Sequence, residues 1–208
     1  MISCYSRLVA SVLILVASPA FAQDNQLYEA PADPNASFVR IVSPGETLTV
    51  VGGNTFDNVK GGVSPYVTTA AGPISVAVGD LVGQGEISVA SFYTFVAGSD
   101  GALHMVQDVI TNSPAKADLV FYNLSDLPSV DLFVPAVNAV ALEGIAQNVS
   151  RQVTLKAPLT LDFEVRDGAT VLASIPGVAM RRRAGVTVVF SGTAGAYTAF
   201  STENLYFN

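Results

Sequence analysis

The sequence has very few of the side chains that carry most enzymatic chemistry. Its 208 residues include one cysteine, Cys4, one histidine, His104, and no tryptophan. Cys4 lies in the apolar segment that opens the chain, so residues 23–208 hold no thiol. That excludes thiol catalysis, disulfides and cysteine-ligated zinc from this part of the chain. Charged residues are also scarce, at 13%, while half of all residues are apolar, which favours a chain that buries much of its surface or presents it to partners.

Residues 1–22 have the three parts of a secretory signal peptide. Arg7 supplies the positive end, residues 8–16 an apolar run, and Ala20-Phe21-Ala22 a small-x-small cleavage site. The run is shorter than the roughly 20 residues that cross a bilayer, and no later stretch is long enough. We therefore predict export, cleavage after Ala22, and no membrane span in the mature chain.

The predicted mature chain is acidic. It holds nine basic and seventeen acidic residues, a net charge of −8. Such a balance argues against general affinity for nucleic acid or for anionic membrane surfaces.

Two pairs of similar stretches indicate an internal duplication. Residues 36–43 resemble residues 117–125, and residues 95–103 resemble residues 189–197. In the second pair Gly98, Gly101 and Ala102 match Gly192, Gly195 and Ala196 in identity and spacing. Glycine tolerates the positive φ of a tight turn, so each stretch predicts a closing β-hairpin. Short strand-like runs separated by turns at about eight to twelve residues are typical of sandwiches and barrels.

The fold class predicted is all-β, with two tandem β-sandwich domains. We place the N-terminal domain with an extended leader at residues 23–108, a linker at 109–116 and the C-terminal domain at 117–200. Residues 201–208 form a tail that contains Glu203-Asn204-Leu205-Tyr206-Phe207, which differs in its last residue from a protease tag. The tail is either an appended tag or native chain. Within the domains we predict a turn at residues 81–85, a strand over residues 86–96 and an Asp167-Gly168 hairpin turn.

No set of catalytic groups can be assembled from the sequence. His104 has no second histidine to share a metal, and no serine lies in a nucleophile-elbow context. Asp162 and Glu164 alternate onto one face of a strand, as on a solvated sheet face. We therefore expect no enzyme activity, no catalytic or metal-binding residues and no cofactor.

Three consecutive arginines stand out against the acidic background. Arg181, Arg182 and Arg183 supply a third of the positive charges of the mature chain, and the corresponding part of the first repeat has none. Guanidinium groups bind carboxylates in a bidentate manner, so this run is a candidate contact for an anionic polysaccharide. The alternative is a loop that only aids solubility.

Two stretches resemble the AlgF family of periplasmic proteins of alginate O-acetylation. They are Leu27-Tyr28-Glu29-Ala30-Pro31 followed by Ser37-Phe38-Val39-Arg40, and Val120-Phe121-Tyr122-Asn123-Leu124-Ser125. The resemblance covers most of the mature chain in order. It implies two β-sandwich domains, a periplasmic location and a non-catalytic accessory role that links acetyl delivery to the acetyltransferases. The partners implied are periplasmic acetyltransferases and a membrane O-acyltransferase complex.

The candidate partner-binding residues are Leu27, Tyr28, Pro31, Phe38 and Arg40. Residues 56–62 and the triple arginine are not features of the family pattern, so the polymer is left open. Two other functions are kept as alternatives. A carbohydrate-binding protein would need exposed aromatic platforms, for which Tyr66, Tyr93 and Tyr122 are the candidates. A structural subunit of the cell envelope is the other.

Overall fold

The computed structural model describes residues 33–45, 49–57, 62–111 and 113–207. The predicted signal peptide and most of the leader, with Leu27, Tyr28 and Pro31, lie outside the described residues. Apart from a short 3-10 turn, η3, the elements of the described chain are strands, which confirms the all-β prediction. No helix in these ranges has the length and apolar character needed to cross a membrane.

The elements follow one another with short connections. They are β1 (Ser37–Val42), β2 (Thr49–Val51), β3 (Asn54–Phe56), β4 (Tyr66–Thr69), β5 (Gly72–Val78), β6 (Leu81–Ile87), β7 (Phe92–Ala97), β8 (Leu103–Asp108), β9 (Lys116–Ser125), β10 (Ser129–Val134), η3 (Pro135–Val137), β11 (Ala139–Ala146), β12 (Val149–Lys156), β13 (Leu159–Asp167), β14 (Thr170–Met180), β15 (Gly185–Gly192), β16 (Thr198–Glu203) and β17 (Tyr206–Phe207).

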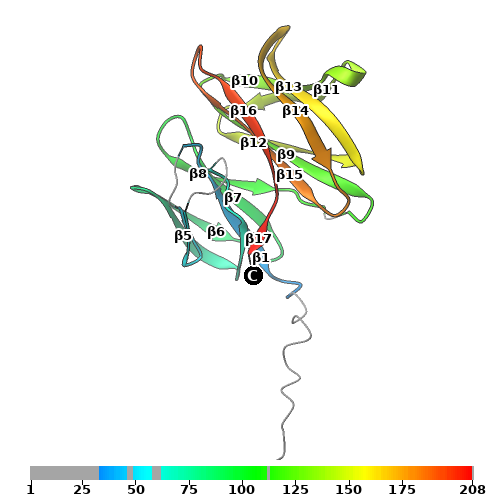
Figure 1. The fold of residues 1–208 in the computed structure, drawn as a ribbon. Helices are drawn as coiled ribbons and strands as arrows, with labels where there is room; N and C mark the ends of the chain where they lie inside the picture. The colour runs from blue at the N-terminus through cyan, green and yellow to red at the C-terminus, as the bar shows by residue number, and fades with distance from the viewer. Residues whose placement is uncertain (1–32, 46–48, 58–61, 112, 208) are drawn as a thin grey trace, which may run out of the picture. The chain divides into compact units, whose positions relative to one another are not determined.

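Four sheets form two sandwiches, as predicted (Figure 1). In the N-terminal sandwich a sheet of order β17-β4-β1-β7-β8 faces one of order β3-β2-β5-β6. Their shared core includes Val39, Ile41, Val76 and Phe95. In the C-terminal sandwich the sheets have the orders β12-β9-β15-β16 and β11-β10-β13-β14, around a larger core that includes Phe163. We name β17-β4-β1-β7-β8 the first inner sheet and β12-β9-β15-β16 the second inner sheet.

The two sandwiches repeat one topology with an offset of eight strands. β1 pairs antiparallel with β4 and parallel with β7, and β9 pairs antiparallel with β12 and parallel with β15. The other two sheets correspond in the same way, strand for strand. The matched stretches of the sequence are therefore equivalent strands and hairpins, which confirms the inferred duplication.

Two local predictions have opposite outcomes. The Asp167-Gly168 turn joins β13 to β14, with Gly168 at a φ of 55°, as predicted. The turn predicted at residues 81–85 is wrong, because these residues belong to strand β6, and β6 and β7 are separate strands. A Cβ at Gly83 would lie 2.8 Å from the ring of Phe95. Glycine is needed in β6 for this close packing, so it does not mark a turn there.

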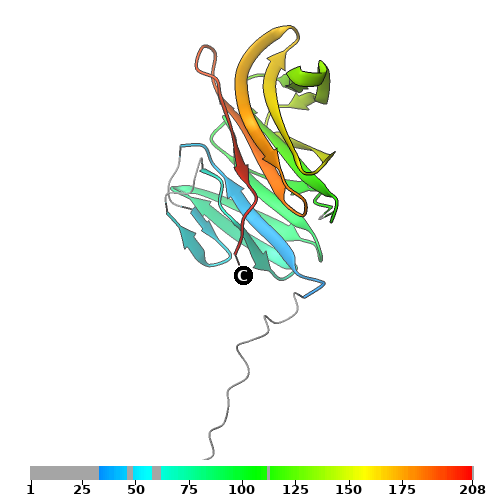
Figure 2. The same cartoon turned by 45° about the vertical axis from the view of Figure 1, so that its right-hand side comes forward.

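The residues set apart as a tail belong to the fold. Residues 201–203 continue β16, and β17 pairs with β4 in parallel, through Tyr206 with Tyr66 and Phe207 with Val67. The chain thus leaves the C-terminal sandwich and adds an edge strand to the N-terminal one, as Figures 1 and 2 show near the C-terminus. The C-terminal sandwich accordingly extends past the boundary drawn at residue 200.

The two inner sheets pack against each other. Strand residues alternate between faces, so Val39 and Ile41 enter the N-terminal core while Arg40 and Val42 face the second inner sheet. Val42 and Val96 join an apolar cluster with Val120 and Val189. Residues 33–208 therefore form one compact unit. β8 ends at Asp108 and β9 begins at Lys116, so β9 includes the last residue of the linker predicted at residues 109–116.

Candidate functional site

A buried polar cluster around Arg40 joins the two inner sheets. The Arg40 side chain is fully buried, although it is a long charged group on the middle strand of the first inner sheet. Its Nε donates to Oγ1 of Thr94 at 3.0 Å, its Nη1 to Oδ1 of Asn204 at 3.0 Å and its Nη2 to the hydroxyl of Tyr122 at 2.9 Å. Thr94 comes from β7 of the same sheet, whereas Tyr122 and Asn204 come from the C-terminal half of the chain.

Asp108, at the end of β8, provides the negative charge of this cluster. Its carboxylate lies 3.8 Å from Nη2 of Arg40. It accepts hydrogen bonds from the hydroxyl groups of Tyr66 at 2.8 Å, Thr94 at 2.5 Å and Tyr122 at 2.7 Å. A buried ion pair is stable only if such additional partners replace the lost water.

Asn204 connects the end of the chain to the same cluster. Besides the bond from Arg40, its Oδ1 accepts one from the hydroxyl of Thr187 at 2.7 Å. Its backbone N–H donates to the carbonyl oxygen of Gly185 at 2.8 Å. A residue between β16 and β17 is thereby fixed to both β1 and β15.

The protonation states of Arg40, Tyr66 and Tyr122 preserve the hydrogen bonds of the cluster. Burial favours the neutral guanidine, but the surrounding oxygens of Tyr122, Tyr66 and Asp108 outweigh this effect, so the pKa of Arg40 is raised and the side chain stays charged. Burial likewise raises the pKa values of the Tyr66 and Tyr122 phenols, which keeps both as hydrogen-bond donors. The Arg40 guanidinium also lies 4.2 Å from the centre of the Tyr66 ring.

These positions change two sequence predictions. The sequence predicts that Arg40 contacts a partner protein, but the side chain is fully buried and links the sandwiches from inside. The tyrosines considered as sugar platforms do not fit that role either. Tyr66 and Tyr122 are 0% exposed and Tyr93 is 6% exposed, so no ring face is open to a sugar.

An aromatic cluster continues from this joint to the surface. Phe38 is partly exposed and stacks on Phe92, with 4.7 Å between the ring centres. The ring of Tyr206, in β17, contacts that of Phe38 edge-on, with 5.8 Å between the ring centres, and stacks on that of Tyr66 at 5.5 Å. Tyr206 itself is 41% exposed. Of the five predicted partner-binding residues, Phe38 is the one that the structure describes at a surface.

The three arginines lie in the exposed turn between β14 and β15. Nη2 of Arg181 pairs with Glu203 at 3.1 Å, and Nε of Arg182 donates to the carbonyl oxygen of Ala157 at 3.0 Å. The backbone N–H of Arg183 donates to the carbonyl oxygen of Lys116 at 3.3 Å. All three side chains are exposed, so the structure places them at a surface, as a binding role requires.

His104 pairs with a carboxylate on an exposed hairpin. Its Nε2 lies 2.9 Å from Oδ2 of Asp100, four residues away across the β7–β8 turn. The side chains are 38% and 50% exposed. The hydrogen bond with His104, followed by that from the backbone of Ala102, lowers the pKa of Asp100. No serine, threonine or cysteine of the described chain is hydrogen-bonded to His104, so a nucleophile–base pair is not formed there.

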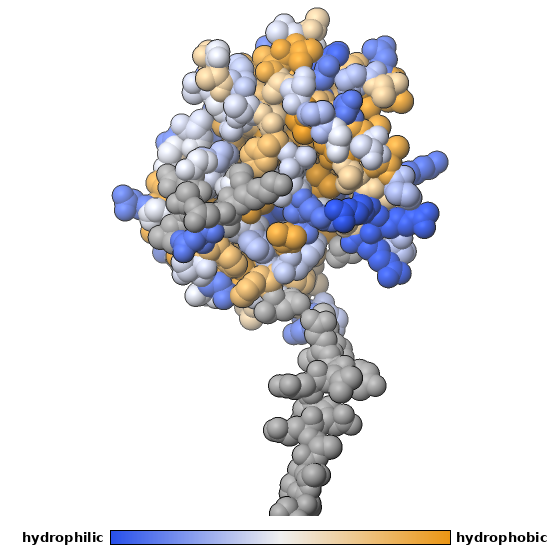
Figure 3. All heavy atoms as spheres, in the orientation of Figure 1, coloured by the Kyte–Doolittle hydropathy of each residue, from blue (hydrophilic) through white to orange (hydrophobic). Residues whose placement is uncertain are grey.

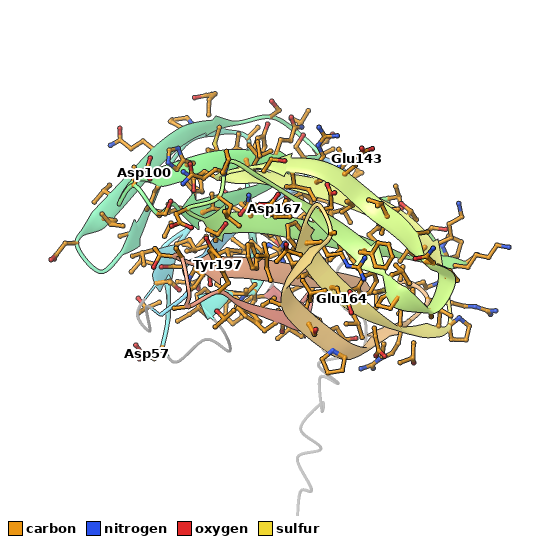
Figure 4. The ribbon with its side chains drawn as sticks, turned by 90° about the horizontal axis from the view of Figure 1, so that it is seen from above. Asp57, Asp100, Glu143, Glu164, Asp167 and Tyr197 are labelled. Atoms are coloured by element: carbon orange, nitrogen blue, oxygen red, sulfur yellow. The ribbon has the colours of Figure 1, made fainter. Side chains whose placement is uncertain are left out.

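The carboxylates of the described chain are dispersed, and several of them accept hydrogen bonds. Figure 4 shows Asp57, Asp100, Glu143 and Glu164 in different parts of the molecule. Glu164 accepts from Nε of Arg166 at 2.8 Å, and Asp162 accepts from the backbone of Gly177 at 2.7 Å. Within the described ranges, no three His, Cys, Asp or Glu side chains are grouped as metal ligands.

One pocket of about 340 Å³ lies beside the C-terminal segment. It is lined by Thr55, Phe56, Asp57, Val63, Ser64, Pro65, Thr202, Glu203 and Leu205. The Ser64 hydroxyl donates to the carbonyl oxygen of Pro65, and Glu203 pairs with Arg181. Among the lining residues that the structure describes, no hydroxyl is hydrogen-bonded to a carboxylate or a histidine.

Sequence reasoning missed Asp108, Thr94 and Asn204. One signal was present: Arg40 interrupts an otherwise apolar strand, and a charge on a buried strand needs a buried partner. Which carboxylate supplies it depends on packing between residues 68 positions apart, and the sequence does not reveal that.

Two comparisons of the sequence with known proteins agree. The sequence model of the family described as "Alginate O-acetyl transferase AlgF" matches residues 10–187. A protein named alginate biosynthesis protein AlgF from Pseudomonas syringae pv. tomato is 24% identical over 195 residues, covering 90% of this chain and 85% of the relative. The protein of the same name from Azotobacter vinelandii is 28% identical over 180 residues, covering 83% of this chain and 80% of the relative.

Proposed function

This chain belongs to the AlgF family, and from that membership we propose that it is a non-catalytic accessory protein of alginate O-acetylation. It acts in the periplasm. There it binds the acetyltransferases that modify the polymer and links them to the membrane O-acyltransferase complex that delivers acetyl groups. The names of its relatives support alginate as the polymer.

One observation carries the non-catalytic part of the proposal. Four of the buried ionisable groups of the described chain, Arg40, Asp108, Tyr66 and Tyr122, are hydrogen-bonded to one another inside the joint and have no access to a substrate. An acyl transferase needs a nucleophile, a base and oxyanion donors around one open site. The exposed His104–Asp100 pair lacks the first of these.

The architecture favours a protein that holds partners. Two sandwiches tied by a buried ion pair, an apolar cluster and a shared strand form a stiff body with surfaces at a fixed spacing. The half-exposed aromatic cluster with Phe38 and Tyr206, at the edge of the first inner sheet, is one such surface. Aromatic residues are enriched in protein–protein interfaces, and tyrosine is common among the few residues that provide most of the binding energy.

The decisive experiment separates the accessory role from the transferase activity that the family description names. Purified mature protein is incubated with p-nitrophenyl acetate, with and without a mannuronate oligosaccharide, and acetate release and polymer acetylation are measured. We expect rates equal to the protein-free reaction. Turnover that His104→Ala or Asp100→Asn removes would overturn the proposal.

A complementation assay tests the requirement for the protein. A strain lacking the gene should produce polymer without acetyl groups, and both the wild-type chain and His104→Ala should restore acetylation to the same level. Because no chemistry is assigned to His104, a loss of acetylation in the folded His104→Ala protein would contradict the proposal.

A further inference from the structure

Five cations meet at one end of the C-terminal sandwich. Lys116 and Lys156 are direct cross-strand partners at the ends of β9 and β12. Arg183 is hydrogen-bonded to the backbone of Lys116, and Arg182 to the backbone of Ala157, next to Lys156. Arg181 precedes them in the same turn. We name Lys116, Lys156, Arg181, Arg182 and Arg183 the basic edge.

All five side chains are exposed, and the chain as a whole carries a net charge of −7. Figure 3 shows strongly hydrophilic residues gathered at the right of the view. In Figure 1 this region lies near the start of β9 and the turn between β14 and β15. Glu203 pairs with Arg181, but one carboxylate leaves the basic edge with a large excess of positive charge.

Two features of the basic edge are unfavourable for folding. Like charges directly opposite one another on neighbouring strands are destabilising, and Lys116 faces Lys156 in this way. Arg183 has a φ of +60°, a conformation that residues with a Cβ adopt at a cost and that glycine adopts freely. Residues kept in unfavourable geometry at a surface point to a function at that surface.

We propose that the basic edge binds an acidic segment of a partner protein. The inference rests on the proposed accessory role and specifies a surface for it. Guanidinium groups bind protein carboxylates in bidentate pairs, and a concentrated charge on an acidic protein directs an oppositely charged partner to one place. Leu159, 40% exposed and paired with Met180 beside Arg181, provides an apolar contact next to the cations.

An anionic polysaccharide is the other polyanion to consider, and the structure favours it less. Sugar sites commonly use open aromatic rings as platforms. The large apolar side chain found beside the basic edge is aliphatic, Leu159, and Tyr66, Tyr93 and Tyr122 are buried. A partner with carboxylates and an apolar side chain matches both the charge and the apolar contact.

Fluorescence anisotropy with two labelled probes tests the proposal. One probe is a peptide of repeated Asp-Glu-Leu-Gly units, and the other is a mannuronate oligosaccharide of equal charge. We expect the mature protein to bind the peptide more tightly than the sugar. Arg182→Ala and Arg183→Gly should each weaken peptide binding about tenfold, the effect of losing one charged hydrogen bond.

Arg151→Ala is the matched control, because it removes an exposed arginine from β12 outside the basic edge. It should weaken binding far less. Arg183→Gly also separates binding from folding, since glycine suits the positive φ and should leave the melting temperature equal or higher.

Three results would overturn the proposal: no peptide binding, equal losses in Arg151→Ala and the basic-edge variants, or tighter binding of the oligosaccharide. Neither probe assay contains an acetyl donor. A failure here would therefore leave the non-catalytic role, which the acetate-release and complementation assays test, unaffected.

Discussion

Nη2 of Arg40, in β1, lies 2.9 Å from the hydroxyl oxygen of Tyr122, in β9. These strands occupy equivalent places in the two repeats, each between an antiparallel and a parallel neighbour. The duplicated units thus meet through equivalent strands that carry different side chains. The duplication provides two similar sheets, and divergence at these positions provides the complementary groups that join them.

Arg40→Ala should be strongly destabilising. It leaves Asp108 buried without its positive partner. It also removes the guanidinium N–H groups that donate hydrogen bonds to Tyr122, Thr94 and Asn204. Breaking one side of a buried ion pair costs about 3–5 kcal/mol, so we expect a loss of that size in the free energy of unfolding measured with urea. Arg151→Ala, an exposed control, should change it by less than about 0.5 kcal/mol. Equal effects of the two substitutions would contradict the role given to Arg40.

Tyr122→Phe tests the hydroxyl that connects the two inner sheets. It removes the donor to Asp108 and the acceptor for Arg40 but leaves the ring in place. Leaving buried charged groups short of a partner costs about 1–3 kcal/mol. Tyr93→Phe is the control, because Tyr93 is also buried but its hydroxyl makes no hydrogen bond within the described chain. Thermal denaturation of both variants should show a clear loss for Tyr122→Phe alone.

Much of the fold could be predicted from the sequence because it depends on local patterns. Alternating apolar residues define the strands, and the Asp167-Gly168 pair defines a turn through backbone preferences alone. The matched glycine turns around Gly98 and Gly192 expose the duplication. The prediction failed at Gly83, where glycine serves packing against Phe95 and so does not mark a turn.

The joint between the sandwiches could not be predicted in the same way. Its members are far apart in the sequence: Arg40 contacts Tyr122 and Asn204, 82 and 164 residues away. No local rule links such positions. For this reason the sequence pattern predicts a surface position for Arg40 and places the segment containing Asn204 in a tail outside the domain.

The Asp100–His104 pair should be visible in a pH titration. Its hydrogen bond lowers the pKa of Asp100 from its ordinary 3.8. A group with a lowered pKa in the folded state stabilises above its ordinary pKa, and this contribution is lost as the pH falls through the folded-state value. NMR titration of the Asp100 carboxyl should show an upward shift of its pKa in His104→Ala. An unchanged value would mean that the pair does not form in solution.

Gly185→Ala tests whether Asn204 holds the end of the chain in place. A Cβ at residue 185 would lie 2.2 Å from Nδ2 and 3.0 Å from Cγ of Asn204, so the amide would have to move from Arg40 and Thr187. Gly185 has no positive φ, which makes the clash the main cost, about 1–3 kcal/mol by the usual penalty for overpacking. Asn204→Ala removes the same two hydrogen bonds and should cost a similar amount. Since both substitutions disrupt one contact, urea denaturation of the double variant should show a loss smaller than the two single losses combined. Additive losses would show that Gly185 and Asn204 act independently, which would contradict the contact between them.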